Sequence, residues 1–159
     1  MMHRIGFGND IHRLVAGRPL VIGGVEIPSH VGPDGHSDAD VLLHAITDAL
    51  LGALALGDVG THFPNTDERW LNAESSVFLR YTLGLLRSHG YAIANIDSTV
   101  SLEKIKLRTY IDEMRGNIAQ ALEIDVDQVS VKAKTSEEVD AVGEGRAVRA
   151  EAVVLLNRA

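Results

Sequence analysis

Three side chains near the start of the sequence have the types and spacing of a metal site. Asp10 and His12, in the segment NDIH, are two residues apart, so on a β-strand both side chains project from one face. His44 lies inside an apolar segment with helical spacing. If strand and helix pack together, two imidazoles and a carboxylate converge with one open position, which suits catalytic zinc or, as an alternative, non-haem iron. Asp48, one helical turn after His44, is expected to hydrogen-bond a ligand imidazole.

The same residues also have a purely structural interpretation. A D-x-H pair often occurs by chance, and the sequence alone does not establish that the strand and the helix meet. Within HSDADVLLHAITDALLG, His36 can be a surface or capping residue, and Asp38 and Asp40 can complement the helix dipole. Glu137 and Glu138 can belong to a solvated turn. Spacing by itself therefore leaves both a metal site and a set of surface and capping residues open.

The elements that would position these side chains follow from hydrophobic periodicity. Ser37 is the expected N-cap of the first helix, with Asp40 as the acid of a capping box, and Gly90 is expected to end the second helix. Segments rich in Gly, Pro, Asp and Glu are expected to be loops, at 31–40, 57–70 and 136–145. The predicted order begins with a strand at 4–14 that its glycines interrupt, followed by strands at 19–22 and 25–28 and helices at 37–52 and 73–89. A strand at 91–103, a helix at 108–122, and strands at 128–135 and 146–157 complete it.

This order of elements predicts an α+β two-layer sandwich, in which helices pack on one face of a mixed sheet. The chain has 159 residues and contains no linker, repeat or low-complexity segment, so we expect a single domain over residues 1–159.

Composition limits the classes of function. The sequence has no cysteine, so any metal must take histidine and carboxylate ligands, and the chain fits a reducing cytoplasm. A net charge of −7 argues against nucleic-acid binding. The first residues, MMHRIGFGNDIHRL, lack the apolar run of a signal peptide, and no segment is apolar for long enough to span a membrane. We therefore expect a cytoplasmic protein that binds neither nucleic acid nor membrane.

Four segments resemble, in order, the motifs of the 2-C-methyl-D-erythritol 2,4-cyclodiphosphate synthase family. They are RIGFGNDIH, GRPLVIGGVEIP, HSDADVLLHAITDALLGALALGDVGTHFPNTD and VKAKTSE, and the likeness runs from Arg4 to Leu156. The combination of D-x-H with H-S-D-x-D-x-x-x-H and a following G-D-[IV]-G-x-x-F-P-x-T-[DS] loop is specific. This resemblance favours the metal-site interpretation.

The resemblance implies a phosphorus–oxygen lyase of the non-mevalonate isoprenoid pathway. Its substrate is 4-diphosphocytidyl-2-C-methyl-D-erythritol 2-phosphate, in which the 2-phosphate attacks the β-phosphorus of the diphosphate. CMP leaves, and 2-C-methyl-D-erythritol 2,4-cyclodiphosphate forms. A phosphate monoester already carries its charge at pH 7, so the main obstacle is repulsion between anions, which metal cations relieve. The resemblance also implies a homotrimer with active sites between adjacent subunits.

The resemblance further implies a role for particular residues. Asp10, His12 and His44 would hold zinc, one ion per subunit, and Glu137 would help to hold a second divalent cation, Mg²⁺ or Mn²⁺. Transition-state stabilisation is expected at His36 and Thr135. The expected substrate-binding residues are Ser37, Asp58, Val59, Gly60, Phe63, Pro64, Asn65, Thr66 and Asp67 for the methylerythritol phosphate end, and Lys106, Leu107, Ala133 and Lys134 for the cytidine diphosphate, together with Leu102.

The sequence departs from the family pattern mainly after Glu137. Glu144 stands where the family usually has arginine, with Arg146 and Arg149 nearby, and smaller departures occur at Asn9, Asn65 and Ile105. Two other functions remain as alternatives. One is a non-catalytic trimeric, zinc-containing module that binds a phosphorylated ligand, and the other is a hydrolase that uses the same two histidines and carboxylate.

Overall fold

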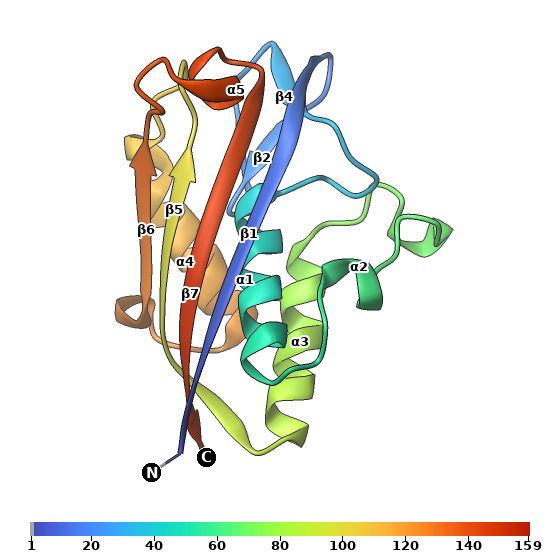
Figure 1. The fold of residues 1–159 in the computed structure, drawn as a ribbon, viewed down its shortest axis with the longest axis vertical. Helices are drawn as coiled ribbons and strands as arrows, with labels where there is room; N and C mark the ends of the chain where they lie inside the picture. Colours follow the sequence, from blue (N-terminus) through green and yellow to red (C-terminus); the bar gives the residue numbers. More distant parts are fainter. Residues whose placement is uncertain (1) are drawn as a thin grey trace.

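The structure is a computed structural model that describes residues 2–159, and it has an α+β architecture (Figure 1). Its strands are β1 (His3–Ala16), β2 (Leu20–Ile22), β3 (Val25–Ile27), β4 (Val31–Pro33), β5 (Tyr91–Ser101), β6 (Val129–Lys134) and β7 (Ala147–Arg158). Its α-helices are α1 (Val41–Ala53), α2 (Val59–His62), α3 (Ser76–Ser88), α4 (Ile111–Leu122) and α5 (Asp140–Gly143). Short 3₁₀ turns lie at Glu68–Trp70, Arg108–Tyr110 and Val126–Gln128. No helix within residues 2–159 has the length and apolar character needed to cross a membrane.

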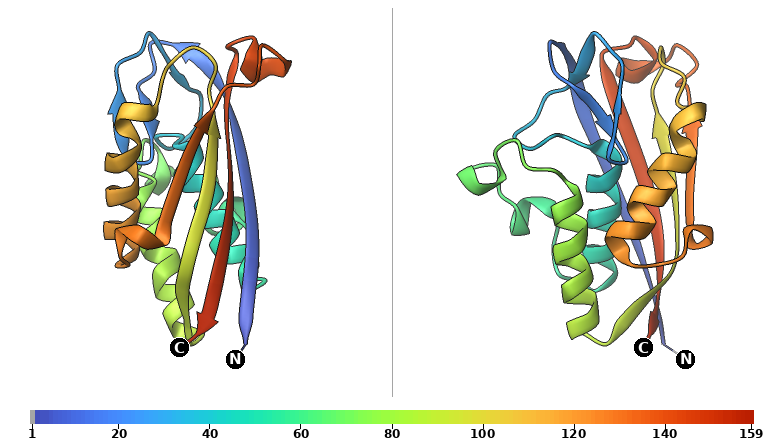
Figure 2. Two further views of the ribbon diagram at one scale, coloured as in Figure 1. Left: turned by 90° about the vertical axis from the view of Figure 1, so that its left-hand side faces the viewer. Right: turned by 180° about the vertical axis from the view of Figure 1, so that it is seen from behind.

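Five strands form a mixed sheet in the order β4-β1-β7-β5-β6, and β2 pairs only with β3 in a separate hairpin. The β5–β6 pair is parallel, whereas β1–β7, β5–β7 and β1–β4 are antiparallel. The first and last strands of the chain are therefore central neighbours, with His3 opposite Asn157. Helices α1, α3 and α4 cover one face of the sheet, which confirms the predicted α+β sheet with helices on one side (Figure 2).

Strand β1 is continuous through its two glycines, although the sequence suggested an interruption there. Gly6 and Gly8 lie on the face that meets α1, where backbone approaches backbone. A Cβ atom at Gly6 would lie 1.8 Å from the carbonyl oxygen of Ala49, and one at Gly8 would lie 2.0 Å from that of Ala45. Because Gly6 and Gly8 have no side chains, the backbone of α1 packs directly against β1. The next residue of β1 on the same face is Asp10.

We expect Gly6→Ala to destabilise the protein by at least about 3 kcal/mol, because neither backbone can move away without disrupting the core. Gly84→Ala is the matched control. Gly84 is exposed in α3, and an added methyl group there would meet nothing within 4 Å, so this change should stabilise the helix by roughly 0.5–1 kcal/mol. Urea unfolding of both variants measures the difference. Equal unfolding midpoints for Gly6→Ala and the parent would contradict the packing argument.

Helix α1 begins later than predicted, because Asp40 and not Ser37 is its N-cap. The fully buried carboxylate of Asp40 accepts hydrogen bonds from the backbone N–H groups of Leu43, Gly23 and Gly24, at 3.1, 2.9 and 2.8 Å. It therefore caps α1 and also fixes the turn of the β2–β3 hairpin against the start of the helix. Ser37 lies outside the helix, in the loop that approaches His44.

The structure contains short elements where the sequence predicted loops. Strand β4 and helices α2 and α5 lie within the segments 31–40, 57–70 and 136–145, respectively. Each is only three or four residues long, which is too short to give a periodic signal in the sequence. The second predicted helix begins at Ser76 rather than at 73, and the third is preceded by a 3₁₀ turn at Arg108–Tyr110.

Candidate metal centre and substrate pocket

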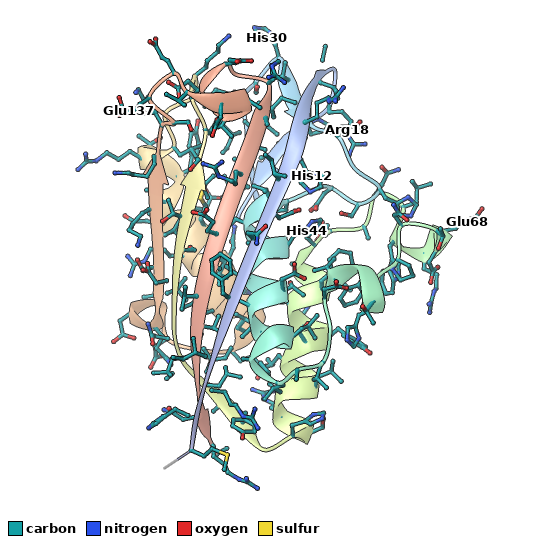
Figure 3. The ribbon with its side chains drawn as sticks, in the orientation of Figure 1. His12, Arg18, His30, His44, Glu68 and Glu137 are labelled. Atoms are coloured by element: carbon teal, nitrogen blue, oxygen red, sulfur yellow. The ribbon has the colours of Figure 1, made fainter. Side chains whose placement is uncertain are left out.

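Strand β1 and helix α1 bring the three predicted metal ligands together. Figure 3 labels two of them, His12 on β1 and His44 on α1. One ligand atom each from Asp10, His12 and His44 lies within 4.8 Å of the others. Nε2 of His12 is 2.8 Å and Nδ1 of His44 is 3.1 Å from the same oxygen, Oδ2 of Asp10. All three side chains are largely buried, with between 12% and 25% of their surface exposed. Close packing at Gly8 and Gly6 thus accounts for the strand–helix contact that the sequence could not establish.

The donor set fits a divalent metal ion. Nδ1 of His12 is 2.9 Å from the carbonyl oxygen of Asp34, which accepts hydrogen bonds only, so this nitrogen carries the proton. Nε2 of His12 is therefore the ring nitrogen that faces Asp10, and once it has lost its proton it offers a lone pair to a metal ion. A buried imidazole nitrogen facing a carboxylate and a second imidazole is typical of a His₂–carboxylate site.

The pKa values of Asp10 and His12 are both shifted in the metal-free protein. Burial acts to raise the pKa of Asp10, but the polar contacts and charge of His12 and His44 outweigh it and lower the pKa to about 2. Burial acts to lower the pKa of His12, but Asp10 outweighs burial and raises this pKa above its usual value. Without metal, Asp10 is therefore ionised at neutral pH and favours a proton on His12, the position that a metal ion takes over.

Zinc binding should become tighter with rising pH. The raised pKa of His12 stabilises the metal-free fold fully below the unfolded pKa, and this contribution is lost as the pH rises through the folded pKa. Zinc must displace that proton, so its stabilisation grows over the same range. We expect the increase in melting temperature caused by zinc to be larger at about pH 8 than at about pH 6. A pH-independent increase in calorimetry would contradict the assignment of His12 as a ligand.

A pocket of about 390 Å³ opens beside the two histidines. Nine residues named from the sequence line it: His12, His36, Ser37, His44, Val59, Gly60, Phe63, Pro64 and Asn65. Asp58, Thr66 and Asp67 belong to the same loop between α1 and α3. Four lining residues were missed by the sequence analysis: Asp34, Gly35, Trp70 and Phe78. Phe78 and Trp70 pack against Phe63 as an aromatic wall, a contact between distant residues that leaves no local signal in the sequence.

Hydrogen bonds to nearby loops determine the shape of this pocket. Asp48 accepts a hydrogen bond from the backbone N–H of Val59 at 2.7 Å, so it holds the loop that carries Val59 and Gly60 at the pocket. Burial raises the pKa of Asp48, and the bond from Val59 acts in the opposite direction. His36 donates from Nε2 to the carbonyl oxygen of Asp67 at 2.9 Å. Because that nitrogen is engaged, Nδ1 of His36 is the ring nitrogen available to a ligand.

Arg18 is a further positioning residue that the sequence analysis did not identify. Its guanidinium donates to the backbone carbonyl oxygens of Pro33, Gly35 and Ser37, at 3.1, 3.0 and 3.1 Å. It therefore orders the chain that leads to His36. An arginine beside the first short strand of GRPLVIGG was visible in the sequence, but the carbonyl groups it contacts depend on tertiary packing.

The remaining predicted residues lie elsewhere in the chain. Thr135 and Glu137 follow β6 at the sheet edge, whereas Asp10 is on β1, so three strand spacings of about 4.8 Å separate their strands. Figure 3 places Glu137 well away from His12 and His44. Ala133 and Lys134 end β6, while Leu102, Lys106 and Leu107 follow β5, the strand that pairs with β6. None of these five residues lines the pocket by the histidines.

The divergent loop after Glu137 carries its own ion pairs. Glu144 pairs with Arg146 at 2.7 Å, and Asp140 pairs with Arg149 at 3.3 Å. Two of the acidic groups that distinguish this loop are thus matched by arginines in the same segment.

Comparison with known proteins agrees with this geometry. A model of the YgbB family matches residues 3–157. The chain is 55% identical over 156 residues to a 2-C-methyl-D-erythritol 2,4-cyclodiphosphate synthase of Salinibacter ruber, covering 98% of this chain and 99% of that protein. It is 59% identical over 158 residues to a bifunctional enzyme IspD/IspF of Albidiferax ferrireducens, covering 99% of this chain but 38% of that longer protein.

Solved structures share the fold over nearly the whole chain. A structure of 2C-methyl-D-erythritol-2,4-cyclodiphosphate synthase aligns with a TM-score of 0.89 at 42% identity, covering 97% of this chain and 100% of that one. A CDP complex of IspF from Plasmodium falciparum aligns with a TM-score of 0.87 at 37% identity, covering 98% and 96%. The match of sequence and fold over nearly the whole chain shows that this chain belongs to the YgbB family.

Proposed function

We propose that this chain converts 4-diphosphocytidyl-2-C-methyl-D-erythritol 2-phosphate into 2-C-methyl-D-erythritol 2,4-cyclodiphosphate and CMP. This is the activity of a 2-C-methyl-D-erythritol 2,4-cyclodiphosphate synthase, in the non-mevalonate isoprenoid pathway. The observation that carries the proposal is the convergence of Asp10, His12 and His44 beside the pocket in a chain of this family. A substrate with three phosphate groups requires such a local positive centre in a chain of net charge −7.

Asp10, His12 and His44 would hold zinc in this site. Zinc bound there supplies positive charge and an open position for a phosphate oxygen. His36, through Nδ1, contacts the 2-phosphate or the diphosphate, and Ser37 contacts the same anion from the loop that Arg18 orders. Phe63 and Trp70 exclude water from one side of the methylerythritol group. The main contribution of the pocket is to hold both ends of a flexible substrate for ring closure.

The nucleotide end of the substrate is assigned to the second location, at the end of β6 and after β5, where Thr135 contacts Glu137. Lys106 and Lys134 are the cations proposed for this location. A solved relative in its CDP-bound form, 41% identical to this chain, supports a CDP site in this family. Thr135 is the group that stabilises charge on the transferring phosphorus. Glu137 is proposed to hold a second divalent cation, Mg²⁺ or Mn²⁺, at the diphosphate.

A homotrimer would unite the two locations. The sheet face not covered by helices exposes large apolar side chains, namely Ile5, Phe7, Ile11 and Val153, which are between 44% and 72% exposed. An apolar face of this kind favours burial against further copies of the chain. Three copies with cyclic symmetry would place the β6 edge of one subunit against the metal centre of its neighbour. Each active site would then lie between two subunits.

Activity should depend strongly on the second cation as well as on zinc. Glu137 and Glu138 are both exposed, and two like charges about 4 Å from a diphosphate repel it by about 4 kcal/mol each at an effective dielectric of 20. We expect zinc-loaded enzyme in magnesium-free, manganese-free buffer to lose at least about 90% of its rate. The measurement is CMP release against added Mg²⁺. Full activity without either cation would contradict the role assigned to Glu137.

Phosphorus NMR of the purified protein with the CDP-linked substrate tests the proposed reaction. The expected result is the appearance of CMP together with a cyclic diphosphate, and no inorganic phosphate. A hydrolase would instead give CMP and a linear product. A non-catalytic module would leave the spectrum unchanged while still binding substrate, which the fluorescence of Trp70, the one tryptophan in the sequence, would report from the pocket wall.

A further inference from the structure

A fully buried serine contacts the metal ligand His44 on the side away from the metal centre. Oγ of Ser75 lies 2.8 Å from Nε2 of His44, whereas Nδ1 of His44 faces Asp10. The same hydroxyl also contacts the carboxylate of Asp38, which accepts a second hydrogen bond from the backbone N–H of Ser75 at 3.1 Å. Ser75 is 0% exposed. Asp38, Ser75 and His44 thus form one hydrogen-bonded chain that ends at the metal centre.

The position of Ser75 in the fold makes this contact unusual. Ser75 is the N-cap of α3, where a serine hydroxyl normally accepts a hydrogen bond from the helix's own N–H groups. Here the hydroxyl makes no such bond. It lies instead between Asp38 and His44 and forms its hydrogen bonds with these two side chains.

The donors and acceptors in this series of hydrogen bonds determine the direction of each bond. Asp38 is surrounded by donors, namely the hydroxyl and N–H of Ser75 and the N–H of Asp40 at 3.1 Å, so its carboxylate acts as acceptor throughout. The hydroxyl proton of Ser75 therefore points to Asp38, and a lone pair of its oxygen faces His44. Nε2 of His44 must then carry the ring proton, which leaves the lone pair on Nδ1, the nitrogen that faces Asp10.

We propose that Ser75 and Asp38 are positioning residues that fix the tautomer and the ring orientation of His44 for metal binding. The inference rests on the metal site of the proposed function. Oγ of Ser37, at 3.3 Å from Nε2, is a longer and weaker second acceptor, and it already accepts from the N–H of Ala39. Groups that hold the far side of a ligand imidazole raise metal affinity by roughly 10–100-fold, and the same factor applies here.

The tautomer can be observed directly in the unaltered, metal-free protein. Long-range ¹H–¹⁵N correlation spectra, recorded at a pH where the imidazoles are neutral, distinguish a protonated Nε2 from a protonated Nδ1. We expect His44 in the Nε2–H form in the parent, and a mixture of the two forms in Ser75→Ala. Asp10, at 3.1 Å from Nδ1, offers the competing acceptor. A parent spectrum dominated by the Nδ1–H form would overturn the proposal without any variant.

Zinc affinity gives the second readout. Competition with a chromophoric chelator should give a zinc dissociation constant roughly 10–100-fold higher for Ser75→Ala than for the parent. Ser76→Ala is the matched control, because Ser76 begins the same helix but its hydroxyl accepts only from Arg80, at 3.2 Å. Its affinity should stay within about twofold of the parent.

The outcomes separate this inference from the proposed function. Equal zinc affinity of Ser75→Ala and the parent, with both folded by circular dichroism, would overturn the role of Ser75 while leaving the metal site in place. If the parent bound no zinc, that result would contradict the proposed function. The tautomer of His44 in the metal-free protein would still test the hydrogen bonds that link Asp38, Ser75 and His44. If Ser75→Ala did not fold, the parent spectrum would remain the deciding measurement.

Discussion

Replacing His44 by alanine is expected to lower kcat/KM for CMP release by at least about 10³-fold, or about 4 kcal/mol, because zinc would lose one of three ligands. The protein should remain folded. His44 is 12% exposed on α1, and its ring packs against only two other rings, those of Phe78 and His12, so its loss should cost about 1–2 kcal/mol of stability. Steady-state rates and zinc content measured on the same sample test both parts.

His30→Ala is the matched control for this substitution. His30 lies near the start of β4, outside the pocket, and its alanine variant should retain the zinc content and rate of the parent. A His44→Ala protein that bound one equivalent of zinc and turned over substrate at the parental rate would remove His44 from the metal site.

Two inactive variants should restore activity when mixed, because the proposed site is shared between subunits. In the proposed site one subunit provides the metal-binding half and its neighbour provides the nucleotide-binding half. His44→Ala removes the metal-binding half of its own subunit, and Glu137→Ala removes the nucleotide-binding half. Each hybrid trimer then contains one interface where an intact metal half meets an intact nucleotide half. After unfolding and refolding together in equal amounts, about three quarters of trimers are hybrids, so about a quarter of the parental activity should return.

The control uses the same two variants in trimers that contain only one kind of subunit. Each variant refolded alone, or both mixed after refolding, should stay inactive unless subunits exchange during the assay. Light scattering must give a trimer mass for every sample. Recovery of no activity from co-refolded trimers would contradict a shared site, and a monomer mass for the parent would contradict the assembly itself.

The sequence predicted which three side chains could converge on a metal ion better than it predicted the contacts around them. Asp10 and His12 were recognisable from their spacing on one strand face, and His44 from its place on an apolar helix. Whether the strand and helix met depended on Gly6 and Gly8, whose role becomes visible only when the carbonyl groups of the facing helix are known. A glycine in a strand was interpreted as an interruption, whereas here it is a point of close approach.

Hydrogen-bond partners far apart in the chain were the main omission. Asp48 was assigned to an imidazole because it is one helical turn from His44, and its contact with the N–H of Val59, which α2 brings closer, was not predicted. Ser75 showed no signal beyond being a serine before a helix. Its partners Asp38 and His44 are more than thirty residues away in the sequence. Periodicity reports which face of an element is buried but not what lies opposite that face.

The pairing of the first strand with the last has a consequence for how the chain folds. β1 and β7 are joined along their length, from His3 opposite Asn157 to Arg13 opposite Ala147, so the loop they close contains almost the entire chain. High contact order of this kind slows folding, since the entropy of closing the loop must be lost before the contacts form. During synthesis β1 is made well before β7. Its apolar outer face and its edge toward β7 are therefore open to aggregation or chaperone binding until β7 has been made.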